Sequence, residues 1–285
     1  MMGKRAMIPS SSRFRAGFTT RSRTFEQKVM LCALAYLVAV HLIALALFVA
    51  WPQMGPSLLA FVAAHHGVLL FASLSPRSRL IGSNLRRLPA AWAGQVALTF
   101  DDGPDLVVTP KVLEILSAYR ARATFFCIGE RAAAHPDIIR AIVAAGHRVE
   151  NHSQRHVGWF AFFGPRAMAR DIERAQTELT RLAGEAPVYF RAPAGMRNPL
   201  TGWVLAKLGL QLVSWTRRGF DTLARDPQRV LKRLTRDLDA GDILVLHDGA
   251  GAREGTPIVL QVLPKLLEHI GSLGLVAVSI PRKIR

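Results

Sequence analysis

Short apolar runs alternate with longer amphipathic segments over the C-terminal two thirds of the chain. Apolar runs whose residue types predict buried β-strands lie near residues 96–100, 123–128, 147–150, 188–191, 211–215, 242–246 and 275–280. Amphipathic segments that predict helices lie near residues 109–119, 131–145, 165–183, 198–208, 227–239 and 256–271. Such alternation with short connections is typical of parallel strands joined by crossover helices.

Proline and glycine mark the ends of several predicted helices. Gly164-Pro165 and Asp226-Pro227 suit helix starts. Glycines that suit helix ends stand at positions 146, 184, 209 and 274. We therefore expect an α/β fold, a distorted (β/α) barrel of about seven parallel strands, over residues 91–285.

The first apolar run ends in two adjacent carboxylates, Asp101 and Asp102, followed by Gly103-Pro104. Adjacent acids repel each other and are costly to remove from water. Their place at the end of a buried strand therefore indicates a metal site, or a proton that is shared or transferred. The alternative without function is a turn or helix start, which the same four residues also suit.

Two histidines, His152 and His156, follow a later apolar run at a spacing of four. On a helix or helical turn this spacing puts both imidazoles on one face. Two imidazoles and one carboxylate make a complete set of protein ligands for a catalytic Zn²⁺-type ion with a position open for water. A lone histidine pair is more often a surface feature, so the metal hypothesis depends on the rest of the chain.

Three further predicted strands also end in polar side chains. The charged or titratable residues that follow them are Arg191, Asp221 and His247. Each cluster lies at the carboxyl end of its strand, which is the face on which β/α barrels build active sites. The sequence thus predicts one site that collects a metal triad, an arginine, an aspartate and a further histidine.

These residues resemble those of the polysaccharide deacetylases, the NodB-homology or carbohydrate esterase family 4 enzymes. The resemblance covers roughly residues 90–285. Five motifs occur in the family's order: TFDDG at 99–103, HSQRH at 152–156, RAPAG at 191–195, a segment from 215 to 221, and LVLHD at 244–248.

The resemblance implies a role for each residue of the predicted metal centre. Asp101 would be the general base, and Arg191 would keep it ionised and oriented. A divalent metal ion would be held by Asp102, His152 and His156. Zinc is the expected ion, with cobalt, nickel or manganese as alternatives.

The other motif residues would complete the reaction that the resemblance implies. His247, paired with Asp221, would be the general acid, because an amine cannot leave an amide as an anion. A backbone N–H near Ala194 and Gly195 would stabilise the oxyanion, and Trp215 would line the substrate pocket.

The chain departs from the family pattern at three positions. Ala194 stands where the family commonly has tyrosine, Arg218 where aspartate is common, and Thr222 where a tryptophan often lines the acyl pocket. The catalytic polar groups are all present, so these departures concern the specificity for the sugar and the acyl group.

Two apolar runs precede the predicted barrel. Residues 29–51 are long enough to span a bilayer, and residues 58–74 form a shorter second run. A signal peptide is the alternative for the first run, but no small-residue cleavage site follows it. We expect a basic, disordered leader at 1–28, one or two transmembrane helices at 29–75, a basic linker at 76–90 and the NodB-like domain at 91–285.

Basic residues flank the two apolar runs, whereas the link between the runs is uncharged. By the positive-inside rule both flanks, and with them the catalytic domain, lie on the cytoplasmic side of a bacterial-type inner membrane. If residues 58–74 do not span, the domain lies outside. More than half of the net charge of +17 precedes residue 90, which fits anionic lipid headgroups better than nucleic acid.

These features predict a membrane-anchored, metal-dependent hydrolase that removes an N-acyl group, expected to be acetyl, from an amino sugar. Placement at the membrane favours a lipid-linked saccharide or glycolipid as the substrate. One alternative is an extracytoplasmic deacetylase of a surface polysaccharide. Another is an inactive barrel that binds membrane sugars, although such a module would need neither a base nor an acid. Two isolated cysteines, Cys32 and Cys127, imply no disulfide framework.

Overall fold

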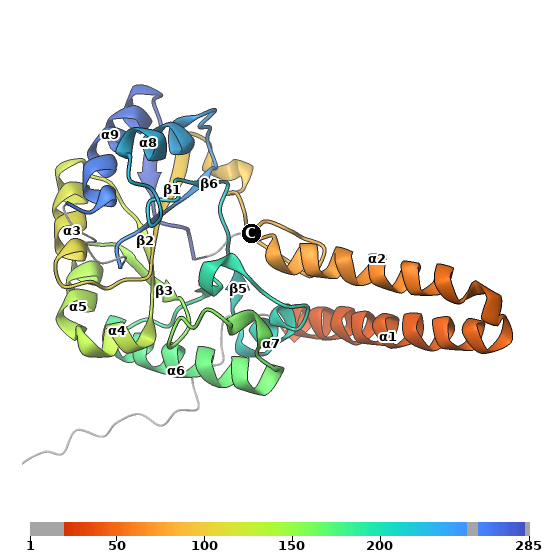
Figure 1. Cartoon of the computed structure of the whole chain (residues 1–285). Helices are drawn as coiled ribbons and strands as arrows, with labels where there is room; N and C mark the ends of the chain where they lie inside the picture. Colours follow the sequence, from red (N-terminus) through yellow and green to blue (C-terminus); the bar gives the residue numbers. More distant parts are fainter. Residues whose placement is uncertain (1–19, 250–255, 283–285) are drawn as a thin grey trace, which may run out of the picture.

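The computed structural model describes residues 20–249 and 256–282. An eight-stranded parallel sheet runs in the order β5-β4-β3-β2-β1-β7-β6, with β8 paired to β1 (Figure 1). The strands are β1 (Gln95–Asp101), β2 (Thr124–Cys127), β3 (Arg148–Asn151), β4 (Tyr189–Phe190), β5 (Gln211–Leu212), β6 (Arg217–Arg218), β7 (Ile243–His247) and β8 (Val276–Val278).

The two outermost strands of the sheet, β5 and β6, are consecutive in the chain. The Val213 N–H donates to the carbonyl of Phe190 (2.9 Å) at one edge, and the Thr216 N–H donates to the carbonyl of Ile243 (2.9 Å) at the other. One extended segment is therefore hydrogen-bonded to both edges of the sheet, and this curls the sheet into a distorted barrel. The predicted α/β barrel and its seven strands are confirmed. The eighth strand, β6, was not predicted because its residues, Arg217-Arg218, carry no apolar pattern.

Helices cover the outside of the barrel. They are α3 (Val108–Ala118), α4 (Gly129–Ala134), α5 (Pro136–Ala144), α6 (Pro165–Ala183), α7 (Thr201–Leu208), α8 (Pro227–Thr235) and α9 (Ile258–Ser272). The single helix expected over residues 131–145 is two helices, because the Pro136 ring cannot continue the preceding helix. The predicted start of α8 is confirmed: the Asp226 carboxylate accepts a hydrogen bond from the Gln228 N–H (2.9 Å).

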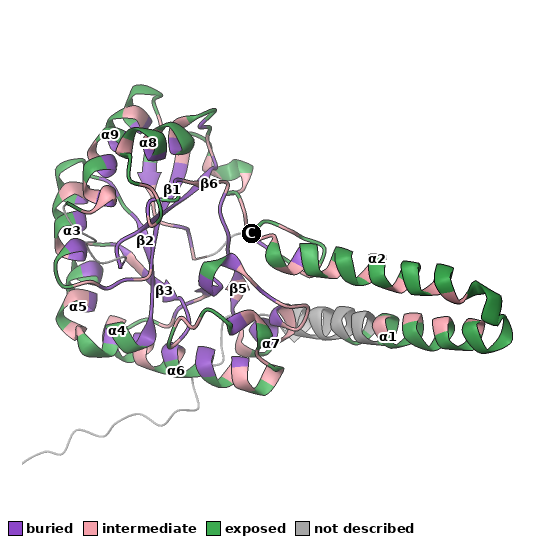
Figure 2. Ribbon diagram, viewed as in Figure 1, coloured by how far each residue is buried: buried purple, intermediate pink, exposed green. Residues whose placement is uncertain are grey.

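Both faces of the central strands are buried. Phe125 of β2 stacks on Phe100 of β1 (5.0 Å between ring centroids) in the cluster that packs against α3 and α9. The next residue, Phe126, points to the other face and joins Tyr189 and Val245 in a second cluster. Figure 2 shows the central strands in purple and the surrounding helices with green on their outward sides. Burial on both faces explains why these strands have continuous apolar sequences.

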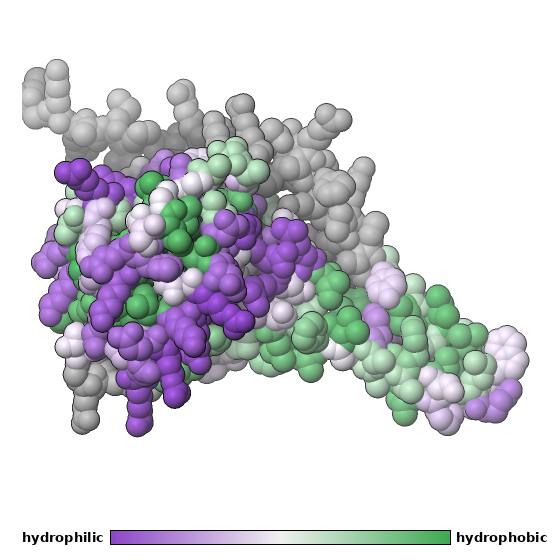
Figure 3. Space-filling view, turned by 90° about the horizontal axis from the view of Figure 1, so that it is seen from above, coloured by the Kyte–Doolittle hydropathy of each residue, from purple (hydrophilic) through white to green (hydrophobic). Residues whose placement is uncertain are grey.

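A helical hairpin projects from the barrel (Figure 1). It consists of α1 (Thr20–Ala50), a short turn at Pro52–Met54, and α2 (Gly55–Leu74). By length and composition, the described segment Pro52–Leu74 could cross a membrane, while Ala35–Ala50 is apolar but shorter. The outer part of the hairpin is largely hydrophobic (Figure 3). Thus the two predicted apolar runs lie in the two helices of a hairpin. The predicted leader lies outside the described residues up to residue 19, and residues 20–28 belong to α1.

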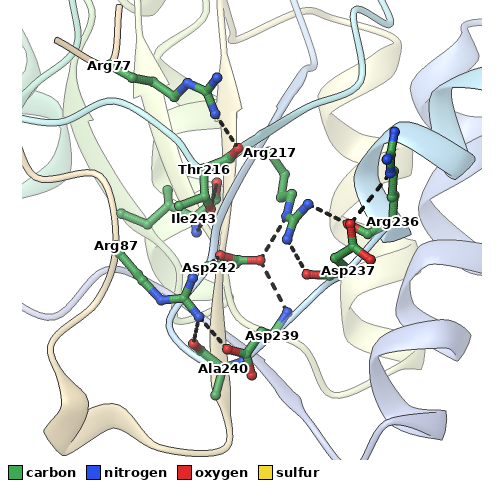
Figure 4. Close-up of polar contacts among 10 residues, drawn as sticks. All are labelled: Arg77, Arg87, Thr216, Arg217, Arg236, Asp237, Asp239, Ala240, Asp242 and Ile243. Carbon is green, nitrogen blue, oxygen red and sulfur yellow. Dashed lines mark hydrogen bonds and ion pairs between the residues drawn. The ribbon is translucent and has the colours of Figure 1, made fainter.

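The segment between the hairpin and β1 is bound along the barrel (Figure 4). Leu85 forms a parallel bridge with Val213, at the free edge of β5. Arg87 donates to one carboxylate oxygen of Asp242 (2.9 Å), and Arg217 donates to the other (2.8 Å). Asp242 is fully buried, so this ion pair network holds the segment against the start of β7.

Replacing Asp242 by alanine should lower the free energy of unfolding by about 3 kcal/mol, because two guanidinium groups lose a buried partner. Asp239→Ala is the matched control, since Asp239 pairs with the same Arg87 but is 74% exposed; it should cost less than about 1 kcal/mol. Urea unfolding of the detergent-solubilised protein measures both. Equal losses would show that the buried network does not hold this segment.

Candidate active site

The two carboxylates at the end of β1 have separate partners. Asp101 is 3% exposed, and its Oδ1 accepts a hydrogen bond from Nη1 of Arg191 (2.6 Å). Asp102 has left-handed backbone geometry (φ 71°), which non-glycine residues seldom adopt. Its Oδ1 lies 3.2 Å from Nε2 of His152 and 3.1 Å from Nε2 of His156. The change of backbone conformation between neighbours thus separates two like charges.

Arg191, directly after β4, lies behind Asp101 and is fully buried. Besides Asp101, it donates to the Thr99 hydroxyl (2.8 Å) and the Ser214 carbonyl (3.1 Å). Its guanidinium carbon lies 4.0 Å from the ring centroid of Phe126. These contacts fix the direction from which Arg191 approaches the carboxylate, as a buried charged pair requires.

The two histidines converge through a loop rather than a helix. After β3, Ser153 and His156 both take positive φ angles (69° and 50°). The Asn151 side chain accepts from the Ser153 N–H (2.9 Å), and the Ser153 hydroxyl accepts from the His156 N–H (3.0 Å). The expected helical turn is therefore wrong, although the two imidazoles do meet; side-chain hydrogen bonds replace the helix in bringing them together.

The geometry of this cluster fits a metal ion. Nδ1 of His152 lies 2.8 Å from the Arg191 carbonyl, so Nδ1 carries the proton and Nε2 presents a lone pair toward Asp102. Oδ1 of Asp102 is buried without a hydrogen-bond donor in the described chain. One carboxylate oxygen and two imidazole nitrogens, all within 4.8 Å of one another, are the donor set that zinc takes in catalytic sites.

Electrostatics keep these groups in the protonation states that a metal needs. Burial raises the pKa of Asp102, but the neighbouring histidines, His152 above all, lower it by more, so the pKa lies well below its usual range. Burial, together with the neighbouring His152, lowers the pKa of His156. At neutral pH the cluster therefore offers an ionised carboxylate and a neutral imidazole at His156.

A second histidine–carboxylate pair, His247 and Asp221, lies near the Asp102–His152–His156 cluster, and both groups line the same cavity. His247 is the last residue of β7. Its ring Nδ1 lies 2.9 Å from Oδ1 of Asp221, and its backbone N–H donates to Oδ2 of the same carboxylate (2.8 Å). Burial lowers the pKa of His247, but the hydrogen bond and charge of Asp221 raise it further, so the net pKa lies above the usual value. His247 is thus held as a proton donor.

One cavity of about 1100 Å³ joins these groups. The predicted site residues that line it are Asp101, Asp102, His152, His156, Ala194, Gly195, Trp215, Asp221 and His247. Arg191 is the one predicted residue that lies behind the wall. The structure therefore brings together every side chain that the sequence placed at the strand ends.

The loop of Ala194 and Gly195 forms part of the cavity wall. Both residues have positive φ angles (53° and 76°). The Gly195 N–H already donates to the Ala192 carbonyl (2.8 Å), whereas the Ala194 N–H has no backbone acceptor among the described residues. Of the two predicted donors, Ala194 is therefore the available one. A Cβ at Gly195 would lie 2.6 Å from the Trp215 ring, so only glycine fits there.

Several supporting residues were given no role by the sequence, although Thr99 and Asp248 lie within the first and fifth motifs. Thr99 had a signal, since it is a polar residue in an otherwise apolar strand. Arg131 had no signal in the sequence, because it reaches the site from another element, α4, and donates there to the Asp102 carbonyl (2.8 Å). Asp248 is fully buried, accepts from the Thr109 hydroxyl (2.6 Å), and burial raises its pKa to about 7. Such contacts depend on which helices face the strand ends, which no local pattern reports.

Comparison with known proteins agrees with this geometry. Residues 92–213 match the polysaccharide deacetylase family. A chitooligosaccharide deacetylase from Sinorhizobium fredii is 33% identical over 211 residues, covering 70% of this chain and 96% of the relative. A peptidoglycan-N-acetylglucosamine deacetylase from Bacillus cereus is 32% identical over 174 residues, covering 60% and 81%.

The fold agrees as well. A family 4 carbohydrate esterase from Streptomyces lividans, solved in complex with acetate, superimposes with a TM-score of 0.60 at 32% identity, over 66% of this chain and 94% of the esterase. With sequence, fold and cavity in agreement, the chain belongs to the polysaccharide deacetylase family, carbohydrate esterase family 4, whose members are hydrolases of amide carbon–nitrogen bonds.

Proposed function

We propose that this chain removes the N-acetyl group from an amino sugar of a saccharide at a membrane, using a divalent metal ion held by Asp102, His152 and His156. The observation that carries the proposal is the shared cavity. The Asp102–His152–His156 cluster, Asp101 with Arg191 behind it, and His247 all lie around this one space, and this grouping supports the proposal.

A divalent ion at Asp102, His152 and His156 would polarise the acetamide carbonyl and lower the pKa of a bound water. Asp101 then accepts the proton of the attacking water. Its carboxylate is held in position because Arg191 donates to it from the buried side.

The remaining groups act on the other side of the amide. The Ala194 N–H is available to stabilise the developing oxyanion. His247 delivers a proton to the sugar nitrogen as the carbon–nitrogen bond breaks, and Asp221 stabilises the charged imidazole before this transfer. Trp215 supplies an apolar wall against which the acetyl methyl or the sugar ring can pack.

The attachment of the hairpin supports a substrate near the membrane. The Arg197 N–H, two residues beyond Gly195, donates to the Ser73 carbonyl in the last turn of α2 (3.2 Å). Arg197 is 2% exposed, and Pro76 packs directly on Gly195. The end of the hairpin thus contacts the loop that walls the cavity. A lipid-linked amino-sugar saccharide, processed on the cytoplasmic face, follows if α1 and α2 both span.

The main alternative is an extracytoplasmic deacetylase of a surface polysaccharide. The peptidoglycan deacetylase among the relatives supports this alternative. The complete set of polar groups in the cavity counts against an inactive sugar-binding module, because binding alone needs no paired base and acid.

Substitution of the two carboxylates should separate their roles. Asp101→Asn should retain the metal and lose turnover by roughly 10²–10⁴-fold, as expected for a general base. Asp102→Asn and His156→Ala should lose stoichiometric metal first. Acetate release and metal content of the purified variants measure both effects. Metal loss in Asp101→Asn alone, or full activity of a verified metal-free preparation, would contradict the assignment.

The pH dependence should report His247. Because its pKa is raised, kcat/KM should stay high as the pH passes the ordinary histidine value of about 6.5 and fall only at higher pH. Asp221→Asn removes the carboxylate that raises this pKa, so the alkaline limb should move to lower pH. His247→Ala should cost far more with amides than with activated esters; equal losses would indicate a structural role.

Fusion reporters should establish the membrane topology. A reporter that is active only outside the cytoplasm should be inactive after Arg87 or Arg285 and active when inserted near Gln53, because basic residues flank the two apolar runs. Activity at Arg285 would place the domain outside and replace the lipid-linked substrate by a surface polysaccharide.

A further inference from the structure

A second cavity adjoins the catalytic cavity. Its volume is about 460 Å³, and Leu223, Ala224 and Arg225 line both cavities. The other residues of the second cavity come from the segment after β6 and from α8; they are Phe220, Asp226, Arg229 and Arg233. This end of the domain carries many hydrophilic side chains (Figure 3). None of the residues that line this second cavity takes part in the proposed reaction.

Arginines dominate this region. Arg218 lines the catalytic cavity, and its guanidinium carbon lies 4.9 Å from the ring centroid of Phe220 and 5.1 Å from that of Trp215. Arg233 approaches Phe220 as well (5.4 Å). Across the described residues, no carboxylate lies within 4.0 Å of the guanidinium nitrogens of Arg218, Arg225 or Arg233. Nε of Arg218 is buried without an acceptor in that part of the chain.

The acidic residues nearby are already engaged. Asp226 is the one carboxylate that lines the second cavity in the described chain. One of its oxygens caps α8 through the Gln228 N–H, and the other lies 3.5 Å from Arg229. In the catalytic cavity, Asp221 is paired with His247. Arg233 donates to the Gly219 carbonyl (3.4 Å), but Arg218, Arg225 and Arg233 have no carboxylate partner in the described chain, so positive charge is in surplus beside the reacting centre.

We propose that Arg218, Arg225, Arg229 and Arg233 form a subsite for an oxyanion group, a phosphate or a carboxylate, that the saccharide carries next to its acetamido sugar. Guanidinium groups bind such oxyanions through paired, charge-assisted hydrogen bonds. The position of Arg225 between the two cavities places the anion beside the reacting sugar. The inference rests on the proposed deacetylase function and defines its substrate as anionic.

Binding of matched saccharides tests the subsite without requiring turnover. The probes are the methyl glycoside of diacetylchitobiose, diacetylchitobiose 1-phosphate, and a disaccharide of N-acetylglucosamine and glucuronic acid. Calorimetry on the full chain bearing Asp101→Asn should give at least one anionic probe a Kd about 10-fold or more below that of the neutral probe at low salt. This preference should shrink as salt screens the charges.

A matched pair of double variants localises the effect. Arg229→Gln/Arg233→Gln should reduce the ratio of anionic to neutral affinity, and Arg218→Gln should do the same from inside the catalytic cavity. Arg166→Gln/Arg170→Gln on α6 removes the same charge at the same spacing from exposed positions that line neither cavity, and should leave the ratio unchanged.

The outcomes are distinct. Preference for the phosphate indicates a lipid-phosphate-linked saccharide, and preference for the uronate alone indicates an acidic polysaccharide; both support the subsite. Equal affinity for all three probes, or an equal change in the control variant, overturns it. Failure of the wild-type protein to release acetate from any probe contradicts the deacetylase function, whereas the binding ratios still decide whether the subsite exists.

Discussion

Two adjacent carboxylates at the end of a buried strand impose the constraint on which the rest of the site depends. Asp101 and Asp102 would repel each other if both faced the same way in a medium of low dielectric constant. The left-handed conformation at Asp102 turns the second carboxylate toward two imidazoles, while the first stays on Arg191. Such a conformation costs of order 1–3 kcal/mol and persists only where the surroundings enforce it. Here the Arg131 contact to the Asp102 carbonyl and the close approach of Gly249 do so.

The parallel barrel brings the partners of the two carboxylates together. Because the strands are parallel, the carboxyl ends of β3, β4 and β7 lie at the same edge of the curled sheet as that of β1. The segment that joins β5 to β6 then supplies both Ser214, whose carbonyl receives Arg191, and Trp215 in the cavity wall. The Ser214 N–H donates to the Leu85 carbonyl (2.9 Å). The stretch that follows the hairpin is thus connected, through Ser214 and Arg191, to the base itself.

Much of this could be predicted from the sequence, because apolar runs and the polar residues that end them are local signals. The strand positions, the ends of α6 and the convergence of ten site residues followed from these patterns and from the family resemblance. The path of residues 152–156 could not be predicted, since a spacing of four is equally compatible with a helix and with a loop closed by Asn151 and Ser153. Strand β6 and Arg131 were also missed, because they depend on contacts between distant segments.

The division of labour between the two carboxylates is the central claim, and anomalous diffraction at the zinc edge tests it most directly. In crystals of the full chain loaded with zinc, the account predicts one ion within about 2.0–2.2 Å of a single Asp102 oxygen and of Nε2 in both His152 and His156. Asp101 should remain on Arg191, outside coordination distance. An ion bound by Asp101, or bridged by both carboxylates, would contradict the account.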